Sequence, residues 1–155
     1  MLKILVRKWD ENKDKLQQEL STREGLKLFD YKDLVKLTFE VIYNTGEVWD
    51  HNQLDLNKMT EIDNGDYQGT LLYLIPFDSY QPSEDEYLMT YVGYGSCSGC
   101  DTLKRIRGEW GDDGKLSKSQ VKAFMKLCKD IITNTIKPYN GGWRLNEEFE
   151  HMEEQ

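Results

Sequence analysis

Cys97 and Cys100 are the first feature of the sequence whose residue types and spacing suit chemistry. They follow an apolar run that ends at Tyr94 and precede a helix-like segment that begins at Asp101. A strand, a Cys-x-x-Cys pair and a helix form the local arrangement of thioredoxin-type redox pairs, because a helix N-terminus lowers the pKa of the first thiol. That fold also requires further strands after the motif helix and a proline loop beside the thiols. Only one long predicted helix and Pro138 remain here, so the sequence favours an interpretation without redox chemistry.

A zinc ion would need four ligands at this place, and the cysteine pair supplies two of them. Cys128 and His51 are available to complete such a set. However, Cys128 falls on the apolar face of the last predicted helix, where a small buried side chain is the ordinary interpretation. We therefore expect neither a metal nor another cofactor.

The same segment is also a candidate anion site. Gly93, Gly95 and Gly99 allow close approach of the backbone, and the amides that open the next helix would point at a phosphate or carboxylate held by Lys104 or Arg105. The pattern matches neither a Walker loop nor a dinucleotide fingerprint. A tight turn capped by a serine is the competing structural interpretation. The candidate binding residues are Tyr94, Ser96, Cys97, Ser98, Gly99, Cys100, Asp101 and Lys104 in this turn, with Asp66 and Tyr67 in a predicted hairpin.

No catalytic residue is assigned from the sequence. Glu61, Asp63 and Asp66 surround the predicted hairpin, and we interpret them as solvated turn residues. The two histidines lie near no nucleophile elbow. The segment 109–120 has the outline of half a calcium loop, but Gly and Gln stand where that loop needs oxygen ligands and a bidentate Glu.

The first part of the chain is predicted to be helical. Trp9, Leu16 and Leu20 form one stripe of a helix over residues 5–24, which Gly25 would end. Residues 31–43 fit both a helix and an alternating strand. Asp30 as an N-cap and Asp33 in the first turn favour the helix.

Strands are predicted in the middle of the chain. Asn64-Gly65 is a strong hairpin signal, and it is followed by a β-rich run over residues 70–75 that Pro76 stops. Residues 87–95 are predicted to form the next strand. The last long helix covers residues 117–137, because Ser117 and Gln120 form a capping box and apolar residues recur on one face.

These elements predict a single α+β domain over residues 1–155. It would have N-terminal helices, a small, mostly antiparallel sheet from about residue 60 to 94, and a long C-terminal helix packed on that sheet. Residues 144–155 are rich in Glu and are predicted to form an acidic tail.

The charge balance limits the partners. With 28 acidic and 20 basic residues, the formal net charge is -8, which argues against general binding to nucleic acid or to an anionic membrane. No apolar run is long enough to cross a bilayer, and an odd number of cysteines suits a reducing compartment. We expect a cytoplasmic protein whose partner has a basic surface.

Three segments carry a resemblance to a known group. YKDLVKLTFEVIY, EIDNGDYQGTLLYLIPFDSYQP and especially EYLMTYVGYGSCSGCDTL resemble small uncharacterised proteins that bacteriophages of Gram-positive hosts encode. The resemblance covers most of residues 30–106. It implies a phage origin and a bacterial cytoplasm, and it carries over no catalytic residue.

The sequence therefore favours a binding role over an enzymatic one. The expected function is that of an acidic phage accessory protein that binds a host protein, for example to inhibit a defence or metabolic factor. The alternative is a binder of a small nucleotide or anion, or a thiol-dependent enzyme, that uses the turn from Gly93 to Cys100. Neither the identity of the partner nor the oligomeric state is predicted.

Overall fold

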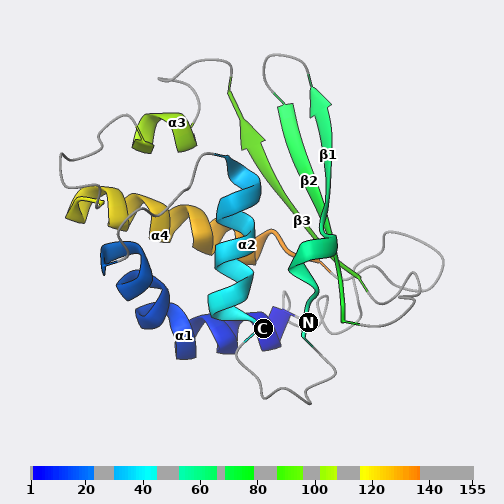
Figure 1. Ribbon diagram of the computed structural model, residues 1–155, viewed down its shortest axis with the longest axis horizontal. Helices are drawn as coiled ribbons and strands as arrows, with labels where there is room; N and C mark the ends of the chain where they lie inside the picture. The colour runs from blue at the N-terminus through cyan, green and yellow to red at the C-terminus, as the bar shows by residue number, and fades with distance from the viewer. Residues whose placement is uncertain are drawn as a thin grey trace.

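The computed structural model describes residues 2–22, 30–44, 53–65, 69–78, 87–95, 102–107 and 116–136. Within them lie α1 (Leu2–Thr22), α2 (Tyr31–Ile42), the 3-10 turn η1 (Leu56–Lys58), β1 (Thr60–Gly65), β2 (Gly69–Pro76), β3 (Tyr87–Tyr94), α3 (Thr102–Arg107) and α4 (Lys118–Thr133). Figure 1 shows α1, α2 and α4 gathered on one side and the three strands on the other. The predicted α+β class, with N-terminal helices, an antiparallel sheet and a C-terminal helix, is confirmed.

Helix α1 buries the predicted apolar stripe. Leu5, Trp9, Leu16 and Leu20 are buried, whereas Val6 on the opposite side is 41% exposed. The helix begins at Leu2, three residues before the predicted start, and the predicted stop at Gly25 lies outside the described residues. Neither α1 nor any other helix in the described part of the chain is long and apolar enough to cross a membrane.

The ambiguous segment after Asp30 is helix α2, so the alternative strand interpretation is wrong. The Asp30 carboxylate accepts a 2.9 Å hydrogen bond from the backbone N–H of Asp33, which satisfies an N–H group left open at the helix start. The apolar side chains then fall on adjoining faces, and α2 packs against α1 and α4. Four apolar residues at helical spacing are all buried: Leu34, Leu37, Val41 and Ile42.

The sheet has the strand order β1-β2-β3, and both pairs are antiparallel. The predicted turn is displaced, because Asn64 pairs with Thr70 and Gly65 pairs with Gly69 as the last rungs of the ladder. The connection is therefore at residues 66–68, which lie outside the described residues. Gly69 permits this register, since a Cβ atom there would lie 2.5 Å from the Asn64 carbonyl oxygen.

Helix α4 has the predicted capping box. The Ser117 hydroxyl accepts from the backbone N–H of Gln120, and the Gln120 side chain accepts from the backbone N–H of Ser117. The helix ends at Thr133 rather than at residue 137. Ile136 instead forms an antiparallel bridge to Met89 on β3, because the chain turns back after the helix cap at Asn134.

The core lies between the helices and one face of the sheet. Buried residues alternate along β3, and Tyr73 and Ile75 of β2 lie on the same face by register. Thr90 of β3 joins the two layers, since its hydroxyl donates a 2.8 Å hydrogen bond to the carbonyl of Ile131 in α4. The opposite face of the sheet carries Ile62, Leu72 and Tyr91 in one row.

Candidate functional site

The register of the sheet places the end of β1 and the end of β3 side by side across β2. Gly65, Gly69 and Tyr94 share one rung across the three strands. Strands β1 and β3 both end here (Figure 1), and in the sequence the predicted hairpin residues come after Gly65 and the glycine–cysteine segment comes after Tyr94.

Most of the predicted binding residues lie outside the described residues. Of the predicted set, Tyr94 is described in full and Lys104 belongs to α3 by its backbone. The redox, metal and anion interpretations of the cysteine turn therefore stay predictions. The predicted residues outside the described ranges are Asp66, Tyr67, Ser96, Cys97, Ser98, Gly99, Cys100 and Asp101.

Tyr94 contacts a carboxylate two strands away. Its phenol donates a 2.6 Å hydrogen bond to Oδ1 of Asp63 in β1, although β2 runs between the two residues. Gly69, which pairs with Tyr94 on the intervening strand, carries no side chain on that face. The tyrosine ring can therefore reach over β2 to the edge strand.

Tyr73 and Glu61 form a second bond of the same kind. The two residues are directly paired in the ladder, and the Tyr73 phenol donates a 2.8 Å hydrogen bond to Oε2 of Glu61. Burial, and after it the hydrogen bond to Glu61 and the negative charge of that residue, raises the pKa of Tyr73 well above its ordinary value. The phenol thus stays protonated and remains a donor to the carboxylate.

Glu61, Asp63, Tyr73 and Tyr94 together form what we term the carboxylate–tyrosine site. Both acids are exposed strand residues that alternate with Ile62, so their interpretation as turn residues is wrong. Within the described part of the chain, no cation lies in ion-pair range of either carboxylate. The site is therefore a negatively charged surface whose two carboxylates are held in place by phenols.

The start of α2 is linked to α3 and acts electrostatically on Tyr73. The Tyr31 phenol, almost fully buried, accepts a 3.2 Å hydrogen bond from the backbone N–H of Leu103 in α3. Asp30, the cap of α2, adds to the negative potential that raises the pKa of Tyr73. The site residues thus come from three strands, and α2 contributes to the electrostatics of Tyr73.

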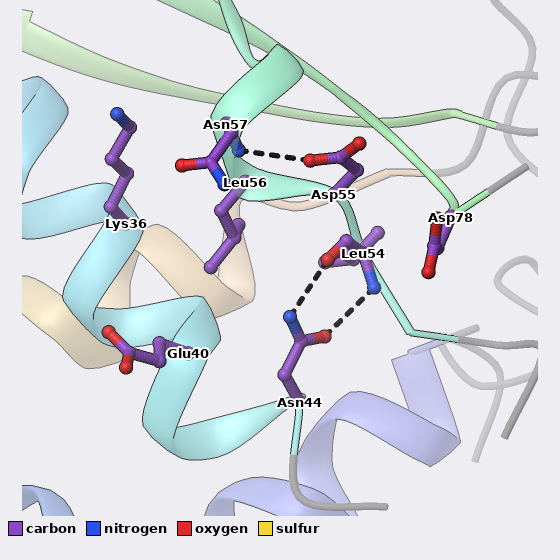
Figure 2. A pocket seen from close by; sticks show the side chains of 8 residues that line it. All are labelled: Lys36, Glu40, Asn44, Leu54, Asp55, Leu56, Asn57 and Asp78. Carbon is purple, nitrogen blue, oxygen red and sulfur yellow. Dashed lines mark hydrogen bonds between the residues drawn. The ribbon is translucent and has the colours of Figure 1, made fainter. Parts of the chain in front are cut away.

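A polar pocket of about 430 Å³ lies near the other end of the sheet (Figure 2). One wall comes from α2 and its end, and the other comes from the segment before β1 and from the residue that follows the Leu54–Phe77 bridge. The lining residues are Lys36, Glu40, Asn44, Leu54, Asp55, Leu56, Asn57 and Asp78. Three carboxylates against one lysine favour a cationic ligand over an anion.

Hydrogen bonds to backbone groups hold the pocket walls in place. The side-chain amide of Asn44 donates to the backbone carbonyl of Leu54 and accepts from the backbone N–H of Leu54, both at 2.8 Å. The backbone N–H of Asp55 donates to the carbonyl of Pro76 at 2.8 Å, and that of Asp78 donates to the carbonyl of Gln53 at 2.7 Å. Sequence reasoning missed this pocket, because its walls come from segments with no shared periodicity.

Cys128 is a buried side chain of the core, as its place on the apolar face of the last helix predicted. It is fully buried, and burial raises the pKa of its thiol to about 12, partly offset by a hydrogen bond with Thr38. Such a thiol is protonated at neutral pH and is a poor nucleophile and metal ligand. Among the described residues, no group of three or more metal-ligating side chains converges.

Comparison of the chain with known protein families, with curated proteins and with solved structures finds no match.

Proposed function

We propose that this chain is an accessory protein of bacteriophage origin that binds a host protein, and that binding inhibits a defence or metabolic factor of the host. The single observation that carries the proposal is the carboxylate–tyrosine site. Its two exposed acids are positioned by phenols, and neither is paired with a cation among the described residues. Fixed acids on a chain of net charge -8 attract and orient a basic surface.

The chemistry of the described groups favours binding over catalysis. General acid–base catalysis at neutral pH needs a group whose pKa is near 7. The raised pKa of Tyr73 keeps its phenol protonated, and the Cys128 thiol is buried and protonated. Neither group is therefore suited to proton transfer at neutral pH: the Tyr73 phenol positions Glu61, and the Cys128 thiol packs in the core.

Affinity capture from a lysate of a Gram-positive bacterium tests the proposal. Three proteins are compared: the natural chain, the double variant Glu61→Gln with Asp63→Asn, and a charge-matched control with Glu11→Gln and Asp14→Asn on the exposed side of α1. Both site substitutions keep an oxygen that can accept from the tyrosine, so the fold is expected to be retained.

The expected result is a protein that is retained by the natural chain and by the control but is lost from the site variant. Retention by all three proteins would show that the carboxylate–tyrosine site does not bind the partner. Capture of nothing by the natural chain would contradict the binding role itself.

Small-ligand binding is the second candidate function, and the pocket in Figure 2 favours it. The ligand could be a cation in this pocket or a nucleotide at the glycine–cysteine turn, and thermal unfolding with added spermidine or ATP distinguishes the two. A rise in melting temperature with spermidine that Asp78→Asn removes would assign a cationic ligand to the pocket, since ligands of the native state stabilise it. A rise with ATP that Cys97→Ser or Lys104→Ala removes would support the glycine–cysteine turn. No rise with either compound would contradict both versions.

A further inference from the structure

Strand β1 is an edge strand with an open side. In the described part of the chain it pairs with β2 alone, and all six of its residues are exposed. Alternate residues of an edge strand direct their backbone N–H and C=O groups away from the sheet, where another extended chain can bind them. This edge is therefore a place for strand addition.

The other edge strand of the sheet, β3, is already paired near its middle with the segment that follows α4. Met89 of β3 exchanges two backbone hydrogen bonds with Ile136, at 2.9 and 2.8 Å. An added strand could not pair continuously along β3 without displacing that bridge. The free edge at β1 is thus the better template of the two.

The two faces of β1 require different side chains from an added strand. Glu61 and Asp63 point to the same face as Tyr73, whereas Ile62 lies on the opposite face in a row with Leu72 and Tyr91. Ile62 is 44% exposed and Tyr91 is 42% exposed, so this row is an apolar stripe open to solvent. Directly opposed residues of neighbouring strands share a face. A strand beside β1 would therefore place basic residues next to the acids and apolar residues next to Ile62.

A second copy of this chain does not satisfy this requirement. If two β1 strands paired antiparallel about a twofold axis, the face that holds Glu61 and Asp63 in one copy would hold the same acids of the other copy. Like charges directly opposed across strands are destabilising, and inward charges on edge strands are a known means of preventing self-association. Charge complementarity therefore selects a different chain.

We propose that β1 binds its partner by strand addition, and that the bound segment is an extended stretch of a protein in which basic and apolar residues alternate. This inference rests on the proposed function and specifies its partner: the basic residues contact Glu61 and Asp63, and the apolar residues extend the row of Ile62. The Tyr73 and Tyr94 phenols position the two carboxylates before the partner binds.

The test uses a synthetic peptide of about eight residues in which lysine and valine alternate, a length typical of strands. A block peptide of the same composition, with all lysines before all valines, is the matched control. Binding is followed by NMR of the full-length protein labelled with nitrogen-15. We expect the alternating peptide to shift the amides of Thr60–Gly65 and to slow their hydrogen exchange, and the block peptide to do neither. The double variant Glu61→Gln with Asp63→Asn should bind about tenfold more weakly, because it removes two cross-strand charge pairs.

Two further peptides distinguish strand addition from simple charge attraction. They carry N-methyl groups on the amides of either the lysines or the valines, and in an added strand only one of these sets faces β1. We expect one methylated peptide to bind as the parent does and the other to lose binding.

Suppose that both methylated peptides and the block peptide bind equally well, and that the double variant of the protein still binds them more weakly. This result would overturn strand addition but would support the acidic binding surface. Binding that the double variant leaves unchanged would overturn the proposed function as well. If the alternating peptide does not bind, strand addition is wrong, and the capture experiment with bacterial lysate then decides the proposed function alone.

Discussion

The phenol of Tyr94 reaches Asp63 across a strand to which neither residue belongs, at 2.6 Å. This bond joins β3, from which the glycine–cysteine turn departs, to the open edge of the sheet. A change in the position of Tyr94 is therefore transmitted to a carboxylate of the proposed partner surface.

Tyr94→Phe should weaken partner binding more than it weakens the fold. The lost bond is exposed, so the free energy of unfolding should fall by about 1 kcal/mol or less. Asp63 would lose its positioning donor, and the affinity for the alternating peptide should drop. Urea unfolding and peptide titration measure the two effects. Tyr87→Phe, at the other end of β3, is the control, and equal effects of the two substitutions would contradict the role of the Tyr94 phenol.

Gly69→Ala should destabilise the end of the sheet, whereas Gly93→Ala should be nearly neutral. A Cβ atom at Gly69 would lie 2.5 Å from the Asn64 carbonyl oxygen and 2.8 Å from the Gly65 Cα atom, and both are backbone atoms that can move little. At Gly93 the nearest atom, the Gly69 carbonyl oxygen, is 3.9 Å away. Thermal unfolding compares the two variants. Similar melting temperatures would show that the hairpin is not as tightly closed as the register requires.

The elements that the sequence predicted well are those with local signals. Asp30 caps α2 through a residue three positions away, and Ser117 and Gln120 cap each other over the same spacing. Such signals are complete within one helical turn, so they can be recognised without knowledge of the rest of the chain.

The features that the sequence did not reveal depend on contacts between distant residues. Asn64-Gly65 is a turn signal by composition, but the observed register pairs both residues in the ladder and requires a glycine at position 69 on the facing strand. The bond from Tyr94 to Asp63 joins residues 31 positions apart, and it depends on the order of three strands. Alternation of Glu61 and Asp63 around Ile62 was the one available sign that these acids belong to a strand.

Asn44→Ala should loosen the pocket and lower stability. The substitution leaves the N–H and C=O groups of Leu54 without their partner at a partly buried place, which typically costs about 1–3 kcal/mol. Urea unfolding measures the loss. Asn57→Ala is the control on the opposite wall, because its exposed side chain lines the same pocket. A loss at Asn44 no larger than at Asn57 would show that the paired bonds to Leu54 do not hold the wall.

Alkaline pH should destabilise the protein through Cys128 and Tyr73. Both groups have a pKa that is higher in the folded chain than in the unfolded chain, where the ordinary values are 9.0 and 10.0. Below pH 9 both groups are protonated in both states, and their contribution to stability is fully present. Above those values the unfolded chain releases protons that the folded chain retains, so the free energy of unfolding falls as pH rises. Each group contributes at most about 1.4 kcal/mol per pH unit.

Urea unfolding between pH 8 and about pH 11 measures this slope for the natural chain, Cys128→Ala and Tyr73→Phe. The cysteine variant should lose part of the slope from pH 9 upward, and the tyrosine variant should lose part of it only from pH 10 upward. Because the two groups lie on different elements, β2 and α4, and have different partners, Glu61 and Thr38, their effects should add. If the slope of Tyr73→Phe matched that of the natural chain, the phenol would not be held protonated beside Glu61, and the positioning of that carboxylate would need another explanation.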